Sequence, residues 1–265
     1  MISIVSAYHN RKDLFYNTLK SIELSNYKDF EYIVVDDCSD EDHRIEEFSQ
    51  IFPFLKVIRL EKKDKWYINP CVVFNKGFKE SKGDIIIIQN PECIHVGDIL
   101  ERASQINDDE YISFGCYSIN EDITKKLLSL IYEKKSDIPN KEFLLNVIKP
   151  DYVGVTMDGQ NGWYNHPILR SVGFHFCSAI TKKNLDDLGG FDERFAIGIA
   201  YDDNELLCRI RKKGLKVNIT TNPFVTHQWH YTTHNYQHVN VAELQDRNRQ
   251  LLTAIINQSS WRANE

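Results

Sequence analysis

The first part of the chain alternates between short apolar runs and segments with helical spacing. The apolar runs, rich in Ile, Val and Tyr, predict buried strands at residues 2–6, 32–35, 55–60 and 84–89. Apolar positions three and four apart predict helices at residues 12–24, 41–50 and 72–83. Strands that alternate with helices in this way predict an α/β fold with a doubly wound, mostly parallel central sheet flanked by helices.

The second part of the chain has a less regular pattern. It predicts strands at residues 111–117, 151–155 and 175–180, and helices at residues 121–132, 182–188, 204–213 and 239–256. Thr181 is suited to cap the second of these helices, and Gly189 to end it. Residues 133–149 are charged and fit either a surface loop or a short helix. Residues 156–167 are expected to form a loop.

Composition narrows the class of protein. The 265 residues are 42% hydrophobic and 26% charged, as in ordinary globular proteins. A net charge of −6 without a long basic run argues against a nucleic-acid partner. No apolar run approaches the roughly 20 residues of a membrane-spanning helix, and we expect no integral membrane segment and no signal peptide. Six scattered cysteines without a C-x-x-C pair favour reduced thiols, so we expect a cytoplasmic protein.

Two adjacent carboxylates follow the second predicted strand. Asp36 and Asp37 come directly after the apolar run at residues 32–35. Ligands of parallel sheets bind just outside the carboxyl ends of the strands, so this position favours a binding site. The alternative is that one carboxylate caps the following helix while the other faces water.

Four sequence blocks, in order, resemble the family 2-type glycosyltransferases. The blocks are ISIVSAYHN at residues 2–10, VVDDCSD at 34–40, NKG at 75–77 followed by Gly83 and Asp84, and GGFDERFAIGIAYDDNELLCR at 189–209. The last block is similar to that of the galactosyltransferase-like branch. The resemblance implies a single domain with the nucleotide-diphospho-sugar transferase (GT-A) fold. Its expected parts are a nucleotide-sugar-binding half at residues 1–100, an acceptor and catalytic half at 101–238, and a C-terminal helix at 239–265.

The resemblance implies a nucleotide-sugar donor, with UDP as the commonest carrier in the family. In the family the second Asp of the pair accepts a hydrogen bond from the base, which places this role on Asp37. Asp36 is then expected to hold the turn or the ribose. The full set of expected donor-binding residues is Ser6, Tyr8, Asp36, Asp37, Asn75 and Asn90. For Tyr8 the alternative is simple packing in the core.

The family usually holds a divalent cation through a D-x-D motif, and this chain departs from that pattern. Residues 90–92 read Asn-Pro-Glu at the corresponding place, so Glu92 alone brings a charge. A Mn²⁺ or Mg²⁺ ion is still expected, since hard cations accept oxygen ligands and often need few carboxylates. The resemblance adds His227 as a further ligand, with His230 next. The alternative is that residues 90–92 form only a turn.

Two more histidines lie close to this pair in sequence. His234 and His238 follow His230 at intervals of four residues, a spacing that could line one helix face and bind Zn²⁺. The simpler expectation is that both are solvated surface residues.

The acidic run at residues 202–205 carries the expected catalytic group. The resemblance places the general base on Asp203, and Asp202 stands where the family has Glu. A carboxylate in this position removes the proton of the acceptor hydroxyl as the glycosidic bond forms. The alternative is that the acidic residues cap a helix and favour its positive end.

An aromatic and polar segment is expected to bind the acceptor. The residues are Trp163, Tyr164, Asn165 and His166. Aromatic rings stack on the apolar faces of sugars, and a loop of this kind can close over a bound donor. The alternative is that the Trp163 and Tyr164 rings pack on the core.

These expectations combine into one predicted function. The enzyme transfers one sugar from a nucleoside-diphosphate sugar to a glycan or other hydroxyl acceptor, as in polysaccharide biosynthesis. A single base candidate without a second, nucleophilic carboxylate predicts inversion at the anomeric carbon. Two alternatives stay open. One is a nucleotidyltransferase, although residues 6–10 lack the glycine-rich loop that it would need. The other is a catalytically weak or silent nucleotide-sugar-binding module, suggested by the depleted D-x-D motif.

Overall fold

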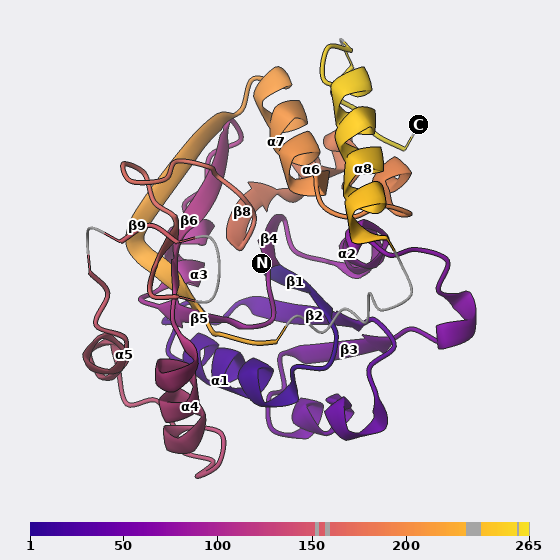
Figure 1. Cartoon of the computed structure of the whole chain (residues 1–265). Coiled ribbons are helices and arrows are strands. Elements are labelled where there is room, and N and C mark those ends of the chain that lie inside the picture. Colours follow the sequence, from indigo (N-terminus) through magenta and orange to yellow (C-terminus); the bar gives the residue numbers. More distant parts are fainter. Residues whose placement is uncertain (152–153, 157–159, 232–239, 259, 265) are drawn as a thin grey trace.

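The predicted fold class is confirmed by the computed structural model of the chain. It describes all residues except 152–153, 157–159, 232–239, 259 and 265. The described residues form one mixed sheet of nine strands with helices on both faces (Figure 1). None of the described helices is long and apolar enough to cross a membrane.

The first four strands form the parallel part of the sheet, in the spatial order β3-β2-β1-β4. Their bounds are Ile2–Tyr8 for β1, Phe30–Asp36 for β2, Leu55–Arg59 for β3 and Ile85–Gln89 for β4. The crossover helices are α1 (Lys12–Ile22) and α2 (Cys71–Glu80). Tyr8 pairs with Asp36 in the ladder, so β1 and β2 end side by side. The carboxyl ends of these strands therefore form one edge of the sheet.

The remaining strands extend the sheet from β4 in the order β8-β6-β9-β5, with β7 paired to β6. Their bounds are Cys93–Val96 for β5, Glu110–Ser118 for β6, Gly162–Asn165 for β7, Cys177–Thr181 for β8 and Lys216–His227 for β9. The helices are α3 (Ile99–Ser104), α4 (Glu121–Leu130), α5 (Lys141–Ile148), α6 (Lys182–Leu188), α7 (Asp202–Lys212) and α8 (Val241–Ile255). The antiparallel β4–β8 pairing joins the two parts of the chain into one sheet.

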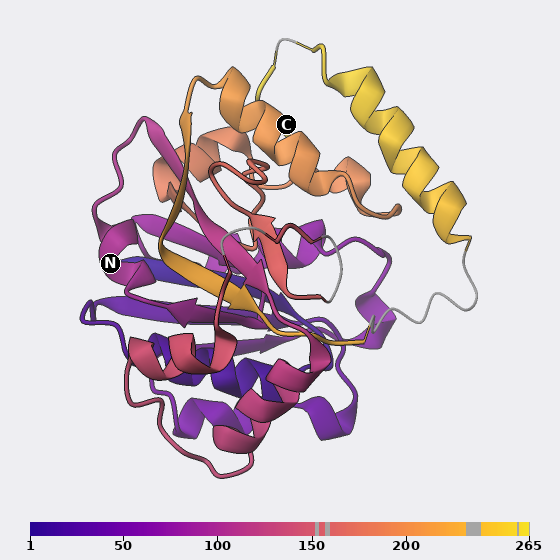
Figure 2. The same cartoon turned by 60° about the vertical axis from the view of Figure 1, so that its left-hand side comes forward.

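Two apolar layers cover the two faces of the sheet. One face packs on α1, α3, α4 and α5, with Phe15 and Leu100 among its buried side chains. The other face packs on α2, α6 and α7, with Phe78 and Leu206. Helix α8 lies beside α7 on this second face (Figure 2). Consecutive β4 isoleucines supply both layers, because Ile87 belongs to the first and Ile88 to the second.

Several predicted elements differ from the structure. The segment predicted as a helix at residues 41–50 forms two 3₁₀ helices, Glu41–His43 and Glu46–Gln50, because the intervening Arg44 has an extended backbone. Residues 156–167 do not form only a loop, since they contain β7. For residues 133–149, the structure agrees with the second of the two predicted alternatives, because they contain the short helix α5. The four-residue strand β5 was too short to be recognised in the sequence.

Some predictions fall partly outside the described residues. These are the strand at residues 151–155, part of the loop at 156–167, the start of the last helix at 239, and both His234 and His238.

The predicted boundaries of α6 are confirmed. The side chain of Thr181 accepts a hydrogen bond from the backbone N–H of Asn184, and Gly189 ends the helix with a φ of 78°. These residues remove unsatisfied backbone groups at both helix ends. The sequence block at residues 189–209 therefore begins where α6 ends.

Gly77 of α2 provides a test of this packing. A Cβ atom on Gly77 would lie 2.4 Å from Cγ1 of Val5 and 3.3 Å from Cγ2 of Val35. We expect Gly77→Val to lower the free energy of unfolding by about 1–3 kcal/mol, because a well-packed core does not accept extra methyl groups. Urea unfolding measures this loss. The exposed neighbour Lys76, changed to Val, is the control and should lose less. Equal losses in both variants would contradict the packing role of Gly77.

Candidate functional site

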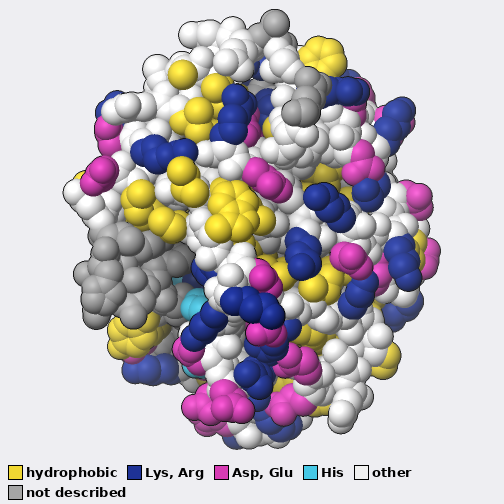
Figure 3. All heavy atoms as spheres, turned by 90° about the vertical axis from the view of Figure 1, so that its right-hand side faces the viewer, with side chains coloured by type: hydrophobic (Ala, Val, Ile, Leu, Met, Phe, Trp, Pro, Cys, Tyr) yellow, Lys and Arg dark blue, Asp and Glu magenta, His cyan; other side chains and the backbone are white. Residues whose placement is uncertain are grey.

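A cavity of about 1110 Å³ opens at the carboxyl edge of the parallel strands. Asp37 after β2, Glu92 after β4 and Asp203 of α7 all line it. Figure 3 shows histidine side chains within a hollow on one face of the molecule, with charged side chains around it. This is the position that parallel α/β sheets favour for ligands.

Asp37 faces the cavity with two donors already on its carboxylate. The hydroxyl of Tyr67 donates to Oδ1 at 2.7 Å, and Nζ of Lys65 lies 2.6 Å from Oδ2. The Asp37 side chain is 13% exposed. A carboxylate offers about four lone-pair sites, so two bonds leave room for a further donor such as a base N–H.

The side chain of Asp36, the neighbour of Asp37, does not line the cavity. It is fully buried, accepts a hydrogen bond from the backbone N–H of Ser39 at 2.9 Å, and pairs with Arg59 at 3.0 Å. Of the two roles expected for Asp36, these contacts correspond to holding the turn. Successive residues of a strand face opposite sides, which explains why the two carboxylates separate.

Two of the other expected donor-binding residues, Ser6 and Asn75, are not among the described residues that line the cavity, whereas Tyr8 lines it. Ser6 is fully buried, and its hydroxyl contacts Tyr32 and the carbonyl of Gln89. Tyr8 reaches the cavity wall, but its ring is buried and its hydroxyl donates to the carbonyl of His43 at 2.7 Å. The expectation for Ser6 therefore needs correction, because its side chain packs in the core near the end of β1. Tyr8 stays a predicted donor-binding residue, with a buried ring at the cavity wall.

The expectation that Asn75 binds the donor also needs correction, whereas Asn90 lines the cavity. The amide of Asn75 donates to the carbonyl of Phe191 at 2.9 Å and accepts from its N–H at 2.8 Å. Asn75 thereby joins α2 to the Gly-Gly-Phe block, away from the donor position. Asn90 borders the cavity, and its backbone N–H donates to the carbonyl of Phe176 at 3.0 Å.

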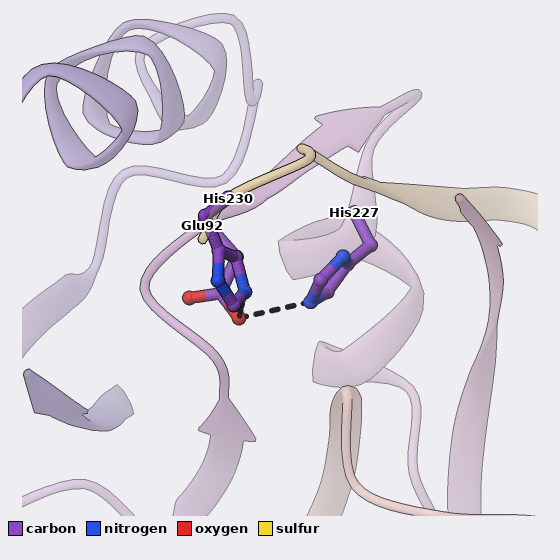
Figure 4. Close-up of side chains that lie close together, drawn as sticks. All are labelled: Glu92, His227 and His230. Atoms are coloured by element: carbon purple, nitrogen blue, oxygen red, sulfur yellow. Dashed lines mark ion pairs between the residues drawn. The ribbon is translucent and has the colours of Figure 1, made fainter. Parts of the chain in front are cut away.

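Glu92 lies beside His227 and His230 (Figure 4), and it also contacts Arg11. Its Oε1 lies 3.0 Å from Nε2 of His227 and 3.6 Å from Nε2 of His230. Its Oε2 lies 2.6 Å from Nη1 of Arg11. One atom each from Glu92, His227 and His230 lie within 4.8 Å of one another, a set of oxygen and nitrogen donors that suits a divalent metal ion.

The electrostatics of this cluster favour the metal-binding protonation states. Burial alone would raise the pKa of Glu92, but Arg11, His227 and His230 outweigh it and hold the pKa well below its usual range. Burial lowers the pKa of His227, and the Glu92 charge only partly opposes this. At neutral pH the cluster therefore presents a carboxylate and a neutral His227 imidazole, as metal ligation requires.

Asp203 and Asp202 begin α7 and diverge from each other. Oδ1 of Asp203 lies 2.5 Å from Nδ1 of His175, and 38% of the Asp203 side chain is exposed at the cavity. Asp202 is buried and accepts a hydrogen bond from Nδ2 of Asn69 at 2.7 Å. Burial and the nearby Asp203 charge raise the pKa of Asp202 to about 6. Of the pair, Asp203 is the group that a substrate can reach.

The expected acceptor segment is mostly buried. Trp163 is 1% exposed and donates its indole N–H to the carbonyl of Asp151, while Asn165 is 0% exposed and binds Ser113 and Phe114. His166 accepts hydrogen bonds from the backbone N–H groups of Ile168 and Leu169. The expectation that these three side chains face an acceptor therefore needs correction.

Tyr164 of the same segment does line the cavity, stacked on Phe176 with ring centroids 5.2 Å apart. The strand period of two explains the division, because β7 turns Trp163 and Asn165 to one face and Tyr164 to the other.

The comparisons with known proteins agree with this geometry. The family model described as glycosyl transferase family 2 matches residues 3–172, more than half of the chain. The chain belongs to this family. No curated protein resembles the sequence closely enough to count as a match.

Several solved glycosyltransferase structures share the fold. Residues 1–349 of S. aureus TarS in complex with UDP-GlcNAc align over 96% of this chain and 65% of that one, with a TM-score of 0.61 and 13% identity. GalNAc-T7 with UDP, GalNAc and Mn²⁺ aligns over 96% and 48%, with a TM-score of 0.64 and 14% identity. The mannosyltransferase PcManGT from Pyrobaculum calidifontis, with GDP-Man and Mn²⁺, aligns over 89% and 58%, with a TM-score of 0.53 and 15% identity.

The chain of this family 2 member covers only part of these solved structures. It spans less than two thirds of the length of each of the three solved chains. At these identities the likeness shows the fold alone.

The sequence did not predict four residues of the candidate site. Arg11, Lys65, Tyr67 and His175 each contact one of the acidic residues that it did single out. Arg11 alone left a signal, since it directly follows the ISIVSAYHN block. The other three come from segments without a recognisable motif, and only the folded chain brings them to their partners.

The His175–Asp203 pair predicts a pH dependence of stability. Burial lowers the pKa of His175, but Asp203 outweighs burial, and the pKa is raised above its ordinary 6.5. A raised pKa means that the pair stabilises the fold fully below about pH 6.5 and loses this contribution as the pH rises through the raised value.

We therefore expect the stability advantage of wild type over His175→Asn to shrink between pH 6 and pH 9, as measured by urea unfolding at each pH. Asn keeps an N–H donor near Asp203 but does not titrate. In an Asp203→Asn background, the difference between His and Asn at position 175 should depend less on pH. An advantage that grows with pH would contradict the assignment.

Proposed function

We propose that this transferase moves one sugar from a nucleoside-diphosphate sugar, UDP-linked by expectation, to a hydroxyl group of a glycan or similar acceptor, with inversion at the anomeric carbon. One observation carries the proposal: a single cavity is lined by Asp37, by the Glu92 cluster and by Asp203. These groups match the three needs of the reaction, which are recognition of the base, compensation of the diphosphate charge and removal of the acceptor proton.

The donor is proposed to lie along the residues 1–100 half. Asp37 accepts a hydrogen bond from the base, while Lys65 and Tyr67 fix the orientation of its carboxylate. The solved neighbours support this donor class, because TarS, PcManGT and GalNAc-T7 were solved with UDP-GlcNAc, GDP-Man and UDP respectively. The half at residues 101–238 then supplies the base and the acceptor side.

The Glu92 cluster is proposed to hold a Mn²⁺ or Mg²⁺ ion through Glu92, His227 and His230. The donor set and its protonation states fit such an ion. A bound divalent ion supplies positive charge that compensates the diphosphate of the donor and of the leaving nucleotide. Arg11 keeps Glu92 ionised whether or not the ion is present, because it lies 2.6 Å from Oε2.

Asp203 is proposed as the general base. It contacts His175 through Oδ1, which leaves Oδ2 to accept the proton of the acceptor hydroxyl. As the oxygen attacks the anomeric carbon, the bond to the nucleoside diphosphate breaks on the opposite face. Tyr164 offers a ring at the cavity wall for the acceptor sugar.

Inversion follows from the number of available carboxylates. Among the described residues that line the cavity, Asp37 is engaged by Lys65 and Tyr67, and Glu92 by Arg11 and the histidines. Asp203 is the carboxylate left for chemistry, and a single displacement needs one base and no enzymatic nucleophile.

Substitution of Asp203 tests the base. We expect Asp203→Asn to lower the transfer rate by about 10²–10⁴-fold, since an amide cannot take the acceptor proton. Donor binding should persist, because Asp203 does not hold the nucleotide. The rate is measured by nucleotide release with acceptor present, and the anomeric configuration of the product by NMR. The exposed Asp186, changed to Asn, is the matched control.

Three results would count against parts of this proposal. Full activity of Asp203→Asn would exclude Asp203 as the base. A product with retained configuration would exclude the single displacement. If wild type neither transferred nor hydrolysed any nucleotide sugar under any metal condition, the silent binding module would become the better interpretation.

Removal of a ligand side chain tests the metal site. We expect Mn²⁺ with UDP to raise the apparent melting temperature of wild type, because a ligand that binds the folded state stabilises it by mass action. His230→Ala should lose most of this ligand-induced shift. The His230 side chain is 20% exposed, so its removal disturbs the core less than that of Glu92, which is 1% exposed. A thermal-shift titration measures both proteins with and without Mn²⁺.

The control for this titration is His43→Ala, a histidine outside the cavity lining. It should keep the full shift. A nucleotide-induced shift that needs no divalent ion in wild type would contradict the metal site at Glu92.

A further inference from the structure

The two residues before α7 have an unusual backbone conformation. Ala200 and Tyr201 have positive φ angles of 59° and 69°. This left-handed region is sterically disfavoured for residues other than glycine, and two such residues in succession persist only when their surroundings hold them. Asp203 lies in the first turn of the helix that follows. The Ala200–Tyr201 turn therefore leads directly into the helical turn that carries Asp203.

Asn248 of α8 holds this turn from the side opposite the sheet. Its side chain is fully buried, and its Nδ2 donates to the carbonyls of Phe195 at 3.1 Å and Ala200 at 2.9 Å. The two carbonyls stand at the two ends of the segment that leads into the turn. An amide has two N–H donors, so one side chain closes this segment at both ends.

Gly198 shows how closely α8 approaches the segment. A Cβ atom on Gly198 would lie 2.1 Å from Oδ1 of Asn248, so only glycine admits the amide at this position. Oδ1 accepts a hydrogen bond from Nη1 of Arg247 at 2.7 Å, which fixes the amide orientation. The backbone N–H of Ile199 donates to the carbonyl of Leu244 at 3.2 Å. Side-chain and backbone contacts from α8 thus act on the same short segment.

The other side of the segment meets the site. The carbonyl of Ala196 accepts hydrogen bonds from the backbone N–H groups of Ile68 and Asn69, at 2.7 Å and 2.9 Å. Asn69 in turn donates to Asp202. Gln245, three residues before Asn248 on α8, lines the cavity itself. The segment is therefore held between α8 and the residues that border the cavity.

We propose that Asn248 of α8 is a positioning residue that holds the Ala200–Tyr201 turn so that Asp203 faces the acceptor. This inference rests on the proposed role of Asp203 as the base. Asn248 is buried and touches no substrate, so it acts only through the backbone. The family match ends at residue 172, and α8 lies outside it.

The first experiment compares Asn248→Leu with Ile255→Ala. Leu has a similar size but no donor for the two carbonyls. Ile255 is a buried residue of the same helix, and none of the contacts to the 195–200 segment given above involves it. We expect Asn248→Leu to lower kcat about 10²-fold with little change in the donor KM, since a misplacement of about 1 Å can cost this much. Ile255→Ala should lose stability but keep kcat. Equal kcat in both variants would overturn the proposal.

A double-variant cycle asks whether Asn248 acts through Asp203. We expect Asn248→Leu to have no further effect on the residual rate in an Asp203→Asn background, because the group that it positions is already gone. Rate losses that multiply would assign Asn248 a general structural role and overturn the proposal. Where Asn248→Leu does not fold, Asn248→Asp replaces it, because it keeps the acceptor for Arg247 and removes the two donors.

Hydrogen exchange separates failure of this inference from failure of the proposed function. The amides of residues 195–203 are followed by mass spectrometry in wild type and in the same variants, without substrate. Faster exchange in Asn248→Leu but not in Ile255→Ala supports the clamp even if the protein turns over no donor. Unchanged exchange in Asn248→Leu overturns the clamp even if Asp203 proves to be the base.

Discussion

The structure of the site depends on one buried carboxylate. Glu92 is 1% exposed, and an uncompensated charge at such depth would cost several kcal/mol. Its compensation comes from Arg11 at the start of α1 and His227 at the end of β9, while Gln228 binds its backbone carbonyl. The charge thus ties the first crossover, the turn after β4 and the last strand together. The same arrangement places the ligand set of the proposed metal site at the carboxyl edge of the sheet.

A second anchor holds the other side of the cavity. Asp203 lies at the positive end of α7, which follows two left-handed residues that cost about 1–2 kcal/mol each. Contacts from α8 and from the segment before α2 compensate this cost, and His175 pairs with the carboxylate. Glu92 reaches the cavity from the end of a strand, whereas Asp203 reaches it from the first turn of a helix. The proposed metal site and the proposed general base therefore rest on different parts of the fold.

The sequence predicted the site best where chemistry and strand ends coincide. Asp37, Glu92, His227 and Asp203 all line the cavity. Asp37 and Glu92 follow predicted strands, whereas His227 and Asp203 were expected from the resemblance to the family. The predictions were wrong where they depended on the direction in which a side chain points from its strand. Ser6 lies near the end of a strand as expected but turns into the core. Trp163 was expected to bind the acceptor, but β7 buries it, in line with the stated alternative of core packing. Composition suggests that an aromatic segment binds sugar, but a strand exposes only every second residue.

By itself the sequence determined the α/β class, the four strands of the parallel part, the capping of α6 and the acidic blocks that flank the cavity. These properties depend on local periodicity and on short motifs, which neighbouring residues decide. Only the tertiary structure decided that Arg11 compensates Glu92, that His175 pairs with Asp203, and that Asn248 supports the turn before α7. The last of these contacts joins residues about fifty positions apart, and no local pattern encodes such a distance. They arise because burial of charges and of backbone carbonyls requires a partner, which the folded chain supplies from wherever it passes.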